Sequence, residues 1–113
     1  MKMTKDTEEK IQQLTMLEQN LQNITVQKQN FQIQLLEIES ALKELEGTKE
    51  AFKIVANIMI KGDKPELKKE LEEKKETIEL RISSFEKQEA KLKQKASALQ
   101  DEVLGKIKNG QSD

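Results

Sequence analysis

The sequence predicts a mostly helical fold, in which two long antiparallel helices form a coiled coil and a short β-hairpin joins them. Apolar residues recur in two heptad series of nearly equal length, and a short segment rich in β-branched residues separates the two series. The chain of 113 residues is 36% charged and only 35% apolar, with three Phe and no Trp or Tyr. This composition is too poor in apolar residues for a conventional compact core and is typical of long, solvent-exposed helices.

The first helix is predicted over residues 4–46. Apolar residues follow one another at alternating steps of three and four, as in a coiled-coil seam, and Lys28 alone breaks the series. Neither Pro nor Gly interrupts this range, and Gly47 supplies a helix stop. At 1.5 Å per residue such a helix would be about 63 Å long. The seam consists of Leu14, Leu17, Leu21, Ile24, Phe31, Leu35, Ile38, Leu42 and Leu45.

The connecting segment, residues 51–61 with the sequence AFKIVANIMIK, favours strand because it is rich in β-branched residues. It is also too short for another useful coiled-coil helix. We predict a β-hairpin with strands near 51–55 and 58–61 and a turn at Ala56 and Asn57. Asn tolerates a left-handed conformation whereas Ala does so poorly, so the turn type stays open.

A lone two-stranded hairpin with apolar groups on both faces and two unpaired edges is marginal in water, so another surface must cover it. Either it is a buried turn that closes a monomeric helical pair, or its strands pair with those of other subunits. We favour the second interpretation, because short loops hold the hairpin at the end of a thin pair of helices. The predicted oligomerisation residues are Phe52, Ile54, Val55, Ile58, Met59 and Ile60.

The second helix is predicted over residues 65–106, and residues 107–113 are expected to form a frayed tail. Asp63 and Pro65 mark its start, since Asp is a favoured cap and Pro fits a first helical turn. Gly105 and Gly110 mark its end. Its seam consists of Leu71, Ile78, Ile82, Phe85, Leu92, Ala96, Leu99 and Val103, with Lys75 and Glu89 at the remaining a positions.

The similar lengths of the two helices predict an antiparallel pairing within a single domain, residues 1–113. On an isolated helix the apolar seam would be exposed to water. Antiparallel pairing of the two helices covers both seams. Sequence separation then places both chain ends at one tip. The expected neighbours are Leu42 and Leu45 with Leu67 and Leu71, and Leu14 and Leu17 with Leu99.

Lys28 on the first helix and Glu89 on the second are charged residues at seam positions. Either they fix the register of the helices at some cost in stability, or they extend their charged heads into water. The second interpretation is favoured.

Several apolar residues near the two chain ends lie off the seam or beyond the paired region. Methionine is flexible and polarisable, which suits surfaces that accept many shapes. These residues are either the last layers of a coiled coil or a surface that binds unfolded proteins. The candidates are Met1, Met3, Ile11, Met16, Leu104 and Ile107, together with the seam residues Leu14, Leu17, Leu99 and Val103, which fraying would expose. Off-seam residues farther along the first helix, Val26, Ile33 and Leu36, either line the inner side of an arm or meet a neighbouring subunit.

Composition and charge argue against several classes of function. With a net charge of -1, the chain has no positive excess to bind a phosphate backbone, so nucleic acid is not an expected partner. Cys is absent and Met1–Glu9 lacks the apolar core of a signal peptide, so we expect a cytoplasmic protein. No apolar run approaches about 18 residues, so we expect it to be soluble and without a membrane span. Without His, Cys or Tyr, with four scattered Gly and with carboxylates on solvated faces, no enzyme activity, cofactor site or metal site is predicted.

The run FKIVANIMIKGDKPELKKELEEKKE, residues 52–76, resembles archaeal prefoldin beta subunits. In that family the hairpin and the following helix carry an aromatic-basic-apolar-Val-Gly motif, an apolar-Lys strand and a Lys/Glu-rich helix start. Two positions depart from the pattern: Ala56 stands where Gly is common, and Phe52 where Tyr often occurs. The alpha subunit has a second hairpin for which this chain has no sequence, so the resemblance is to the beta type.

The resemblance implies a hexamer of two alpha and four beta subunits, in which Phe52 to Lys61 form strands of an intersubunit β-barrel. It also implies an ATP-independent holdase whose coiled-coil tips bind unfolded client proteins and pass them to a group II chaperonin. The main alternative is a structural coiled-coil adaptor that does not bind unfolded chains. A helical arm that grips RNA is less compatible, because Glu and Lys interleave through residues 66–79 and leave no basic stripe.

Overall fold

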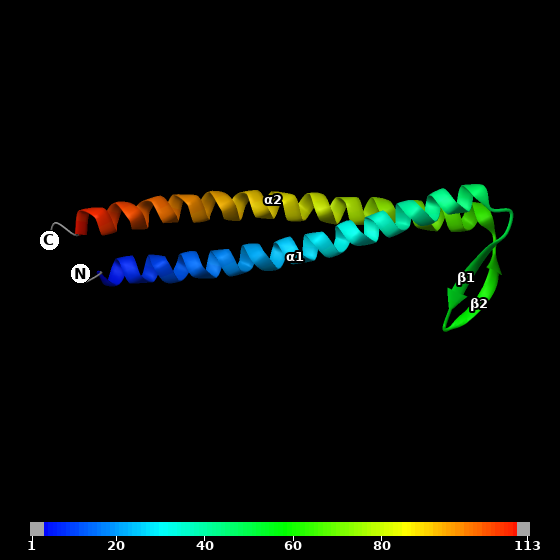
Figure 1. The fold of residues 1–113 in the computed structure, drawn as a ribbon, viewed down its shortest axis with the longest axis horizontal. Helices are drawn as coiled ribbons and strands as arrows, with labels where there is room; N and C mark the ends of the chain where they lie inside the picture. Colours follow the sequence, from blue (N-terminus) through cyan, green and yellow to red (C-terminus); the bar gives the residue numbers. More distant parts are fainter. Residues whose placement is uncertain (1–3, 111–113) are drawn as a thin grey trace. The chain divides into compact units, whose positions relative to one another are not determined.

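The computed structural model describes residues 4–110, with side chains described through Lys108, and it contains two helices and one two-stranded antiparallel sheet (Figure 1). This confirms the predicted fold class. The described residues form two compact units. The terminal unit combines the residues up to Lys28 with those from Ser84 onward, and the hairpin unit is Gln29–Ser83. The elements, in chain order, are α1 (Lys5–Gly47), β1 (Ala51–Val55), β2 (Ile58–Gly62) and α2 (Lys64–Gly110).

Helix α1 begins at a side-chain cap. The Thr4 hydroxyl accepts a hydrogen bond from the backbone N–H of Thr7 at 3.1 Å, and the Thr4 carbonyl accepts one from the N–H of Glu8 at 3.0 Å. These bonds satisfy donors that the first helical turn would otherwise leave without partners. The start of α1 therefore agrees with the prediction to within one residue.

The first residue of α2 caps the end of α1. The Lys64 ammonium donates hydrogen bonds to the carbonyl oxygen of Glu46 at 3.3 Å and to that of Thr48 at 2.8 Å. A lysine in this position satisfies the last carbonyls of a helix and lies at the negative end of its dipole. At the start of α2 itself, the Asp63 carbonyl accepts the first helical hydrogen bond, from the N–H of Leu67 at 2.9 Å.

Helix α2 extends farther than the sequence indicated. It runs to Gly110, so residues 107–110 of the expected frayed tail are helical. Gly105 lies inside the helix, where a Cβ atom would meet nothing within 4 Å apart from the neighbouring residues and backbone of its own helix. A single Gly inside a helix costs about 1 kcal/mol relative to Ala, which a helix of 47 residues absorbs without ending.

The hairpin turn has two residues, Ala56 and Asn57, and both adopt left-handed conformations, with φ of 48° and 67°. Positive φ at both central residues is what a type I′ turn requires, and this turn matches the twist of the flanking strands. Val55 pairs with Ile58 directly across the turn. The predicted strands are confirmed, with β2 one residue longer, and the open question of turn type is answered.

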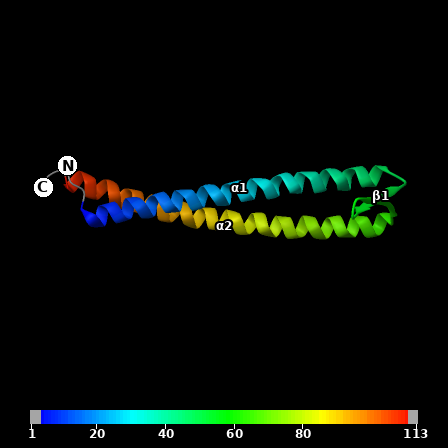
Figure 2. The ribbon, with the colours of Figure 1, turned by 90° about the horizontal axis from the view of Figure 1, so that it is seen from below.

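In the terminal unit, the two helical segments run side by side in opposite directions (Figure 2). Ion pairs between the segments define their register: Asp6 pairs with Lys106, Lys10 with Glu102, and Lys28 with Glu89. Residues near the two ends of the described chain therefore lie together, in the register that the sequence predicted. Val103 is buried in this unit.

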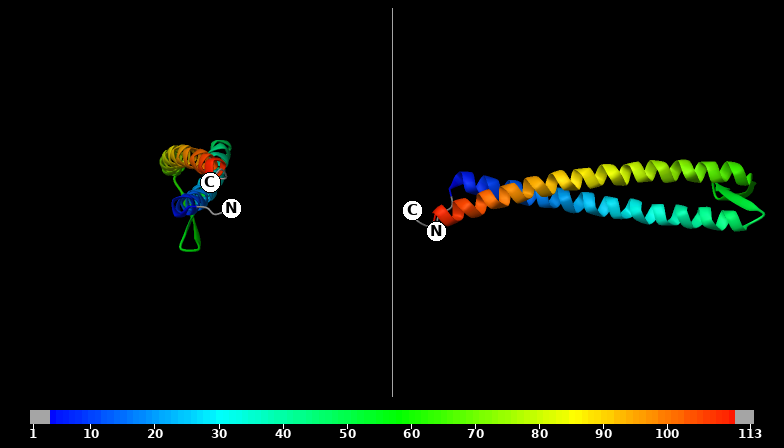
Figure 3. Two further views of the ribbon diagram at one scale, coloured as in Figure 1. Left: turned by 90° about the vertical axis from the view of Figure 1, so that its left-hand side faces the viewer. Right: turned by 90° about the horizontal axis from the view of Figure 1, so that it is seen from above.

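In the hairpin unit, the segments of α1 and α2 are again antiparallel, and the hairpin joins them (Figure 3). Leu45, Ile78 and Ile82 are the buried apolar residues of this unit among those described. Strand β2 comes close to α2, because a Cβ atom on Gly62 would lie 2.5 Å from the Cδ1 atom of Leu67. Only glycine at this position lets the strand approach the helix without displacing the leucine.

Candidate functional site

The hairpin exposes all six apolar residues predicted to mediate oligomerisation. Between 46% and 68% of the surface of each one is accessible to solvent. Opposite residues in the sheet share a face, and successive residues alternate between faces. One face therefore carries Phe52, Ile54 and Met59, and the other carries Val55, Ile58 and Ile60.

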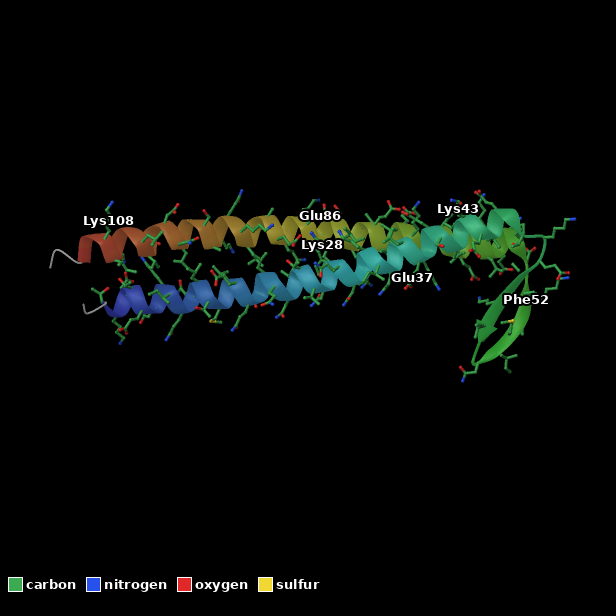
Figure 4. The ribbon with its side chains drawn as sticks, in the orientation of Figure 1. Lys28, Glu37, Lys43, Phe52, Glu86 and Lys108 are labelled. Carbon is green, nitrogen blue, oxygen red and sulfur yellow. The ribbon has the colours of Figure 1, made fainter. Side chains whose placement is uncertain are left out.

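The face that carries Phe52, Ile54 and Met59 is solvated along its length, and Figure 4 shows Phe52 on the protruding hairpin. The opposite face is anchored only at its base, where the Lys53 ammonium lies 3.1 Å from Oε2 of Glu70 on α2. Toward the turn, this second face is also exposed. Both faces of the sheet are thus available to a partner.

Both edges of the sheet are also open. The sheet of the described chain has two strands, so β1 and β2 each carry one row of unpaired backbone N–H and C=O groups. Such edges pair readily with a strand from another chain. A groove of about 480 Å³ lies beside the hairpin in the same unit, with Leu45, Phe52, Ile54, Leu67 and Leu71 among its lining residues. These features together make the hairpin a candidate assembly surface.

The terminal unit carries the candidate residues for binding unfolded proteins, which we call the terminal surface. Met16 and Leu104 are its exposed members, at 63% and 57% of their surface. Val103 is buried in the seam and would reach a ligand only if the helices separated there. Ile11, Leu14, Leu17, Leu99 and Ile107 are half-buried, and Met1 and Met3 lie outside the described residues.

A buried polar cluster links the two helices of the terminal unit. The Lys28 ammonium lies 2.6 Å from Oε1 of Glu89, and the Thr25 hydroxyl donates a hydrogen bond of 2.8 Å to Oε2 of Glu89. The prediction that Lys28 and Glu89 extend their charged heads into water is therefore wrong. Figure 4 shows Lys28 on the side of α1 that faces α2.

The surroundings of Glu89 favour its charged form. The hydrogen bond from Lys28, and then the one from Thr25, lower the pKa of the Glu89 carboxyl below its ordinary value of 4.5, against the opposing effect of burial. Thr25 could not be identified from the sequence, because its hydrogen bond to Glu89 depends on the register of the helices. The cluster binds the helices to each other and offers no open coordination position or cleft.

The hairpin unit also has a groove of about 820 Å³, where acidic residues such as Glu37 and Glu73 stand among basic residues such as Lys74 and Arg81. Arg81 lies over the ring of Phe31, 5.6 Å from its centroid. Within residues 4–110, no three acidic side chains are grouped so that they could hold a metal ion. In the same range, neither helix has an apolar stretch sufficient to cross a membrane.

Comparisons with known proteins agree on one family. The family model described as "Prefoldin subunit" matches residues 8–110. Prefoldin subunit beta of Thermococcus onnurineus is 38% identical over 94 residues, which cover 80% of this chain and 81% of the relative. Prefoldin subunit beta of Archaeoglobus fulgidus is 36% identical over 96 residues, 82% of this chain and 83% of the relative.

A solved structure shares the fold. The crystal structure of the prefoldin beta subunit from Thermococcus strain KS-1 superposes with a TM-score of 0.87 at 32% sequence identity, and covers 92% of this chain and 94% of that chain. The similarity therefore extends over both helices and the hairpin.

Proposed function

This chain belongs to the prefoldin family, and we propose that it is a subunit of an ATP-independent holdase that binds unfolded proteins and prevents their aggregation. The resemblance to archaeal beta subunits is confirmed by these relatives. The rest of the proposal concerns how the chain assembles, what it binds and where it passes the bound protein.

The exposed hairpin is the observation that carries the proposal. A lone hairpin with apolar residues on both faces and two open edges is marginal in water. We propose that β1 and β2 pair with strands of neighbouring subunits, in an intersubunit β-barrel built by two alpha and four beta subunits. Phe52, Ile54 and Met59 would then be covered on one face, and Val55, Ile58 and Ile60 on the other.

Assembly would strengthen the binding of unfolded proteins by the terminal surface. Each copy offers a few exposed apolar side chains, Met16 and Leu104 among them, and each contact with an unfolded chain is weak. Several copies joined on one body raise the effective concentration of contacts, which strengthens overall binding without any new contact type. We propose that unfolded clients are held in this way in the cytoplasm and released to a group II chaperonin, with no nucleotide and no catalytic step.

The test is light scattering from a chemically unfolded, aggregation-prone protein diluted into this chain and a candidate alpha subunit without ATP. We expect near-stoichiometric amounts of the complex to suppress aggregation. Undiminished scattering in the presence of a confirmed hexamer would favour the alternative, a structural adaptor that does not bind unfolded chains.

A further inference from the structure

Helix α1 carries an uncharged band on its surface. Every exposed residue from Gln19 to Leu36 is uncharged, and the one charged residue of this range, Lys28, is turned toward Glu89. Glu18 and Glu37 end the band on its two sides. We call the exposed residues of this range the neutral band.

The rest of the molecule makes this band unusual. Of the 32 residues 64–95 of α2, 18 are charged, and the chain as a whole is 36% charged. Charges on exposed helix faces keep such a protein soluble and unassociated. The 18 residues of α1 from Gln19 to Leu36 have no exposed charge, so this stretch lacks the protection against association that charges provide. Helix α2 has no comparable stretch among residues 64–95.

The neutral band combines amide and aliphatic side chains. Nine of its residues are Gln or Asn, and the other three are Val26 in the terminal unit and Ile33 and Leu36 in the hairpin unit. These three aliphatic side chains are 49%, 55% and 66% exposed. Among the side chains that the structure describes, which end at Lys108, the amide that takes part in an internal hydrogen bond is that of Gln88 on α2. The Gln and Asn residues of the neutral band are exposed, and their amides make no hydrogen bond to another described residue.

We propose that the neutral band is a second contact surface for unfolded polypeptide, in addition to the terminal surface. The inference rests on the proposed holdase function and names a further part of its binding site. An unfolded chain offers backbone N–H and C=O groups together with apolar side chains. Gln and Asn side chains both donate and accept hydrogen bonds, so they satisfy either backbone group whatever the client sequence.

The absence of charge fits the same partner. An apolar segment that packs beside a lysine or glutamate forces that charge to lose water, and this costs free energy unless a counter-charge is supplied. A client of arbitrary sequence supplies no counter-charge at a fixed place. A neutral surface with scattered aliphatic residues avoids this cost for every apolar segment.

A folded partner is a poorer fit. The buried centre of an interface between folded proteins is mostly apolar, whereas nine of the twelve residues of the neutral band are Gln or Asn. A second copy of α1 packed on this band would need apolar residues repeating as in a coiled-coil seam. Here Gln19, Gln22 and Gln29 occupy positions that such a seam would require to be apolar. Weak contacts with an extended chain require neither feature.

The test uses two matched pairs of variants in the full chain, assembled with the alpha subunit. In the hairpin unit, Leu36→Gln is compared with Leu80→Gln, since Leu80 on α2 is 67% exposed and lies outside the band. In the terminal unit, Gln22→Glu is compared with Gln94→Glu, an exposed residue of α2. The dissociation constant for a reduced, alkylated and permanently unfolded protein is measured by fluorescence anisotropy, and the assembled mass by light scattering.

We expect Leu36→Gln and Gln22→Glu each to weaken binding roughly threefold to tenfold, as the loss of one aliphatic contact or the burial of one unpaired charge predicts. The α2 variants should stay within about twofold of the unsubstituted chain. Equal effects in both members of each pair would overturn the inference while leaving the holdase proposal intact. A change in assembled mass caused by Leu36→Gln would also overturn it, because the band would then be a subunit interface. If the unsubstituted complex fails to bind the probe, the holdase proposal itself is wrong, and this inference with it.

Discussion

Lys28 and Glu89, which are 61 residues apart in the sequence, meet across the helices of the terminal unit with 2.6 Å between Nζ and Oε1. Each occupies a seam position that would otherwise hold an apolar side chain. Thr25 completes the hydrogen bonding of the carboxylate. A one-turn slip of either helix would separate the two charges and leave the Glu89 carboxylate buried without its lysine.

We expect Lys28→Met to reduce the free energy of unfolding by about 2 kcal/mol, because it leaves the Glu89 carboxylate buried with a single hydrogen-bond donor. Urea denaturation followed by circular dichroism, at fixed protein concentration, measures the change. Lys91→Met replaces an exposed lysine of α2 and is the control. A Lys28→Met effect no larger than that of the control would mean that the ion pair contributes little.

Stability should depend on pH through Glu89. Since the native pKa of Glu89 is lowered, its contribution is complete above the unfolded-state value near 4.5 and is lost as the pH falls through the native value. The difference in unfolding free energy between the unsubstituted chain and Glu89→Gln should therefore be constant from about pH 7 to pH 5 and shrink below about pH 4. Denaturation curves at these pH values measure it. A difference that grew on acidification would contradict the assigned sign.

Ala56→Gly should stabilise the hairpin by about 1 kcal/mol, because Ala56 adopts φ of 48°, where a Cβ atom costs energy that glycine does not incur. Hydrogen exchange at the amides of β1 and β2 reports this change directly. The same substitution at Ala90, an exposed residue inside α2, should instead destabilise the helix by about 1 kcal/mol. Effects of the same sign at the two sites would contradict the left-handed turn.

Ile58→Asp should prevent assembly, because it places a charge on the apolar face that a neighbouring strand would cover. The mass of the complex with an alpha subunit, measured by light scattering, reports the loss. Leu80→Asp is the matched control, since Leu80 is as exposed as Ile58 but lies on α2. An unchanged mass for Ile58→Asp would exclude the hairpin as the oligomerisation element.

Removal of residues 1–10 and 104–113 should spare assembly and strongly weaken capture of unfolded protein, although Met16 and the neutral band remain. The deletion removes Leu104 and Ile107 but leaves the hairpin unit and the buried cluster around Glu89 intact. Assembled mass and suppression of aggregation are measured on the same preparation. Loss of assembly, or full capture by the shortened chain, would place the binding surface elsewhere.

The helices and strands could be predicted from the sequence because they depend on local periodicity. Apolar residues spaced alternately three and four positions apart specify a helical seam. Two residues between segments rich in β-branched residues specify a tight hairpin. The conformation of Ala56 could not be predicted in the same way. Its own preference opposes φ of 48°, and the pairing of Val55 with Ile58 imposes it.

The sequence predicted which residues form the candidate surfaces, but it did not predict how much of each side chain is exposed to solvent. Val103 and Leu104 are neighbours in the sequence, yet one is buried and the other is 57% exposed, because a helix turns about 100° per residue. The pairing of Lys28 with Glu89 required the register of two helices, and a lysine is long enough to reach either water or a partner. Composition alone does not choose between these two outcomes.

The cap that Lys64 places on the carbonyl end of α1 has a consequence for how this molecule can change over evolution. The hydrogen bonds to Glu46 and Thr48 join the two helix ends directly, across the base of the connection. Substitutions in the strands therefore leave that junction intact. The sequence of the hairpin can change while the end of α1 and the start of α2 stay joined. Gene duplication followed by substitutions within residues 51–61, with Gly62 retained beside Leu67, would give subunits with new pairing preferences on an unchanged helical frame.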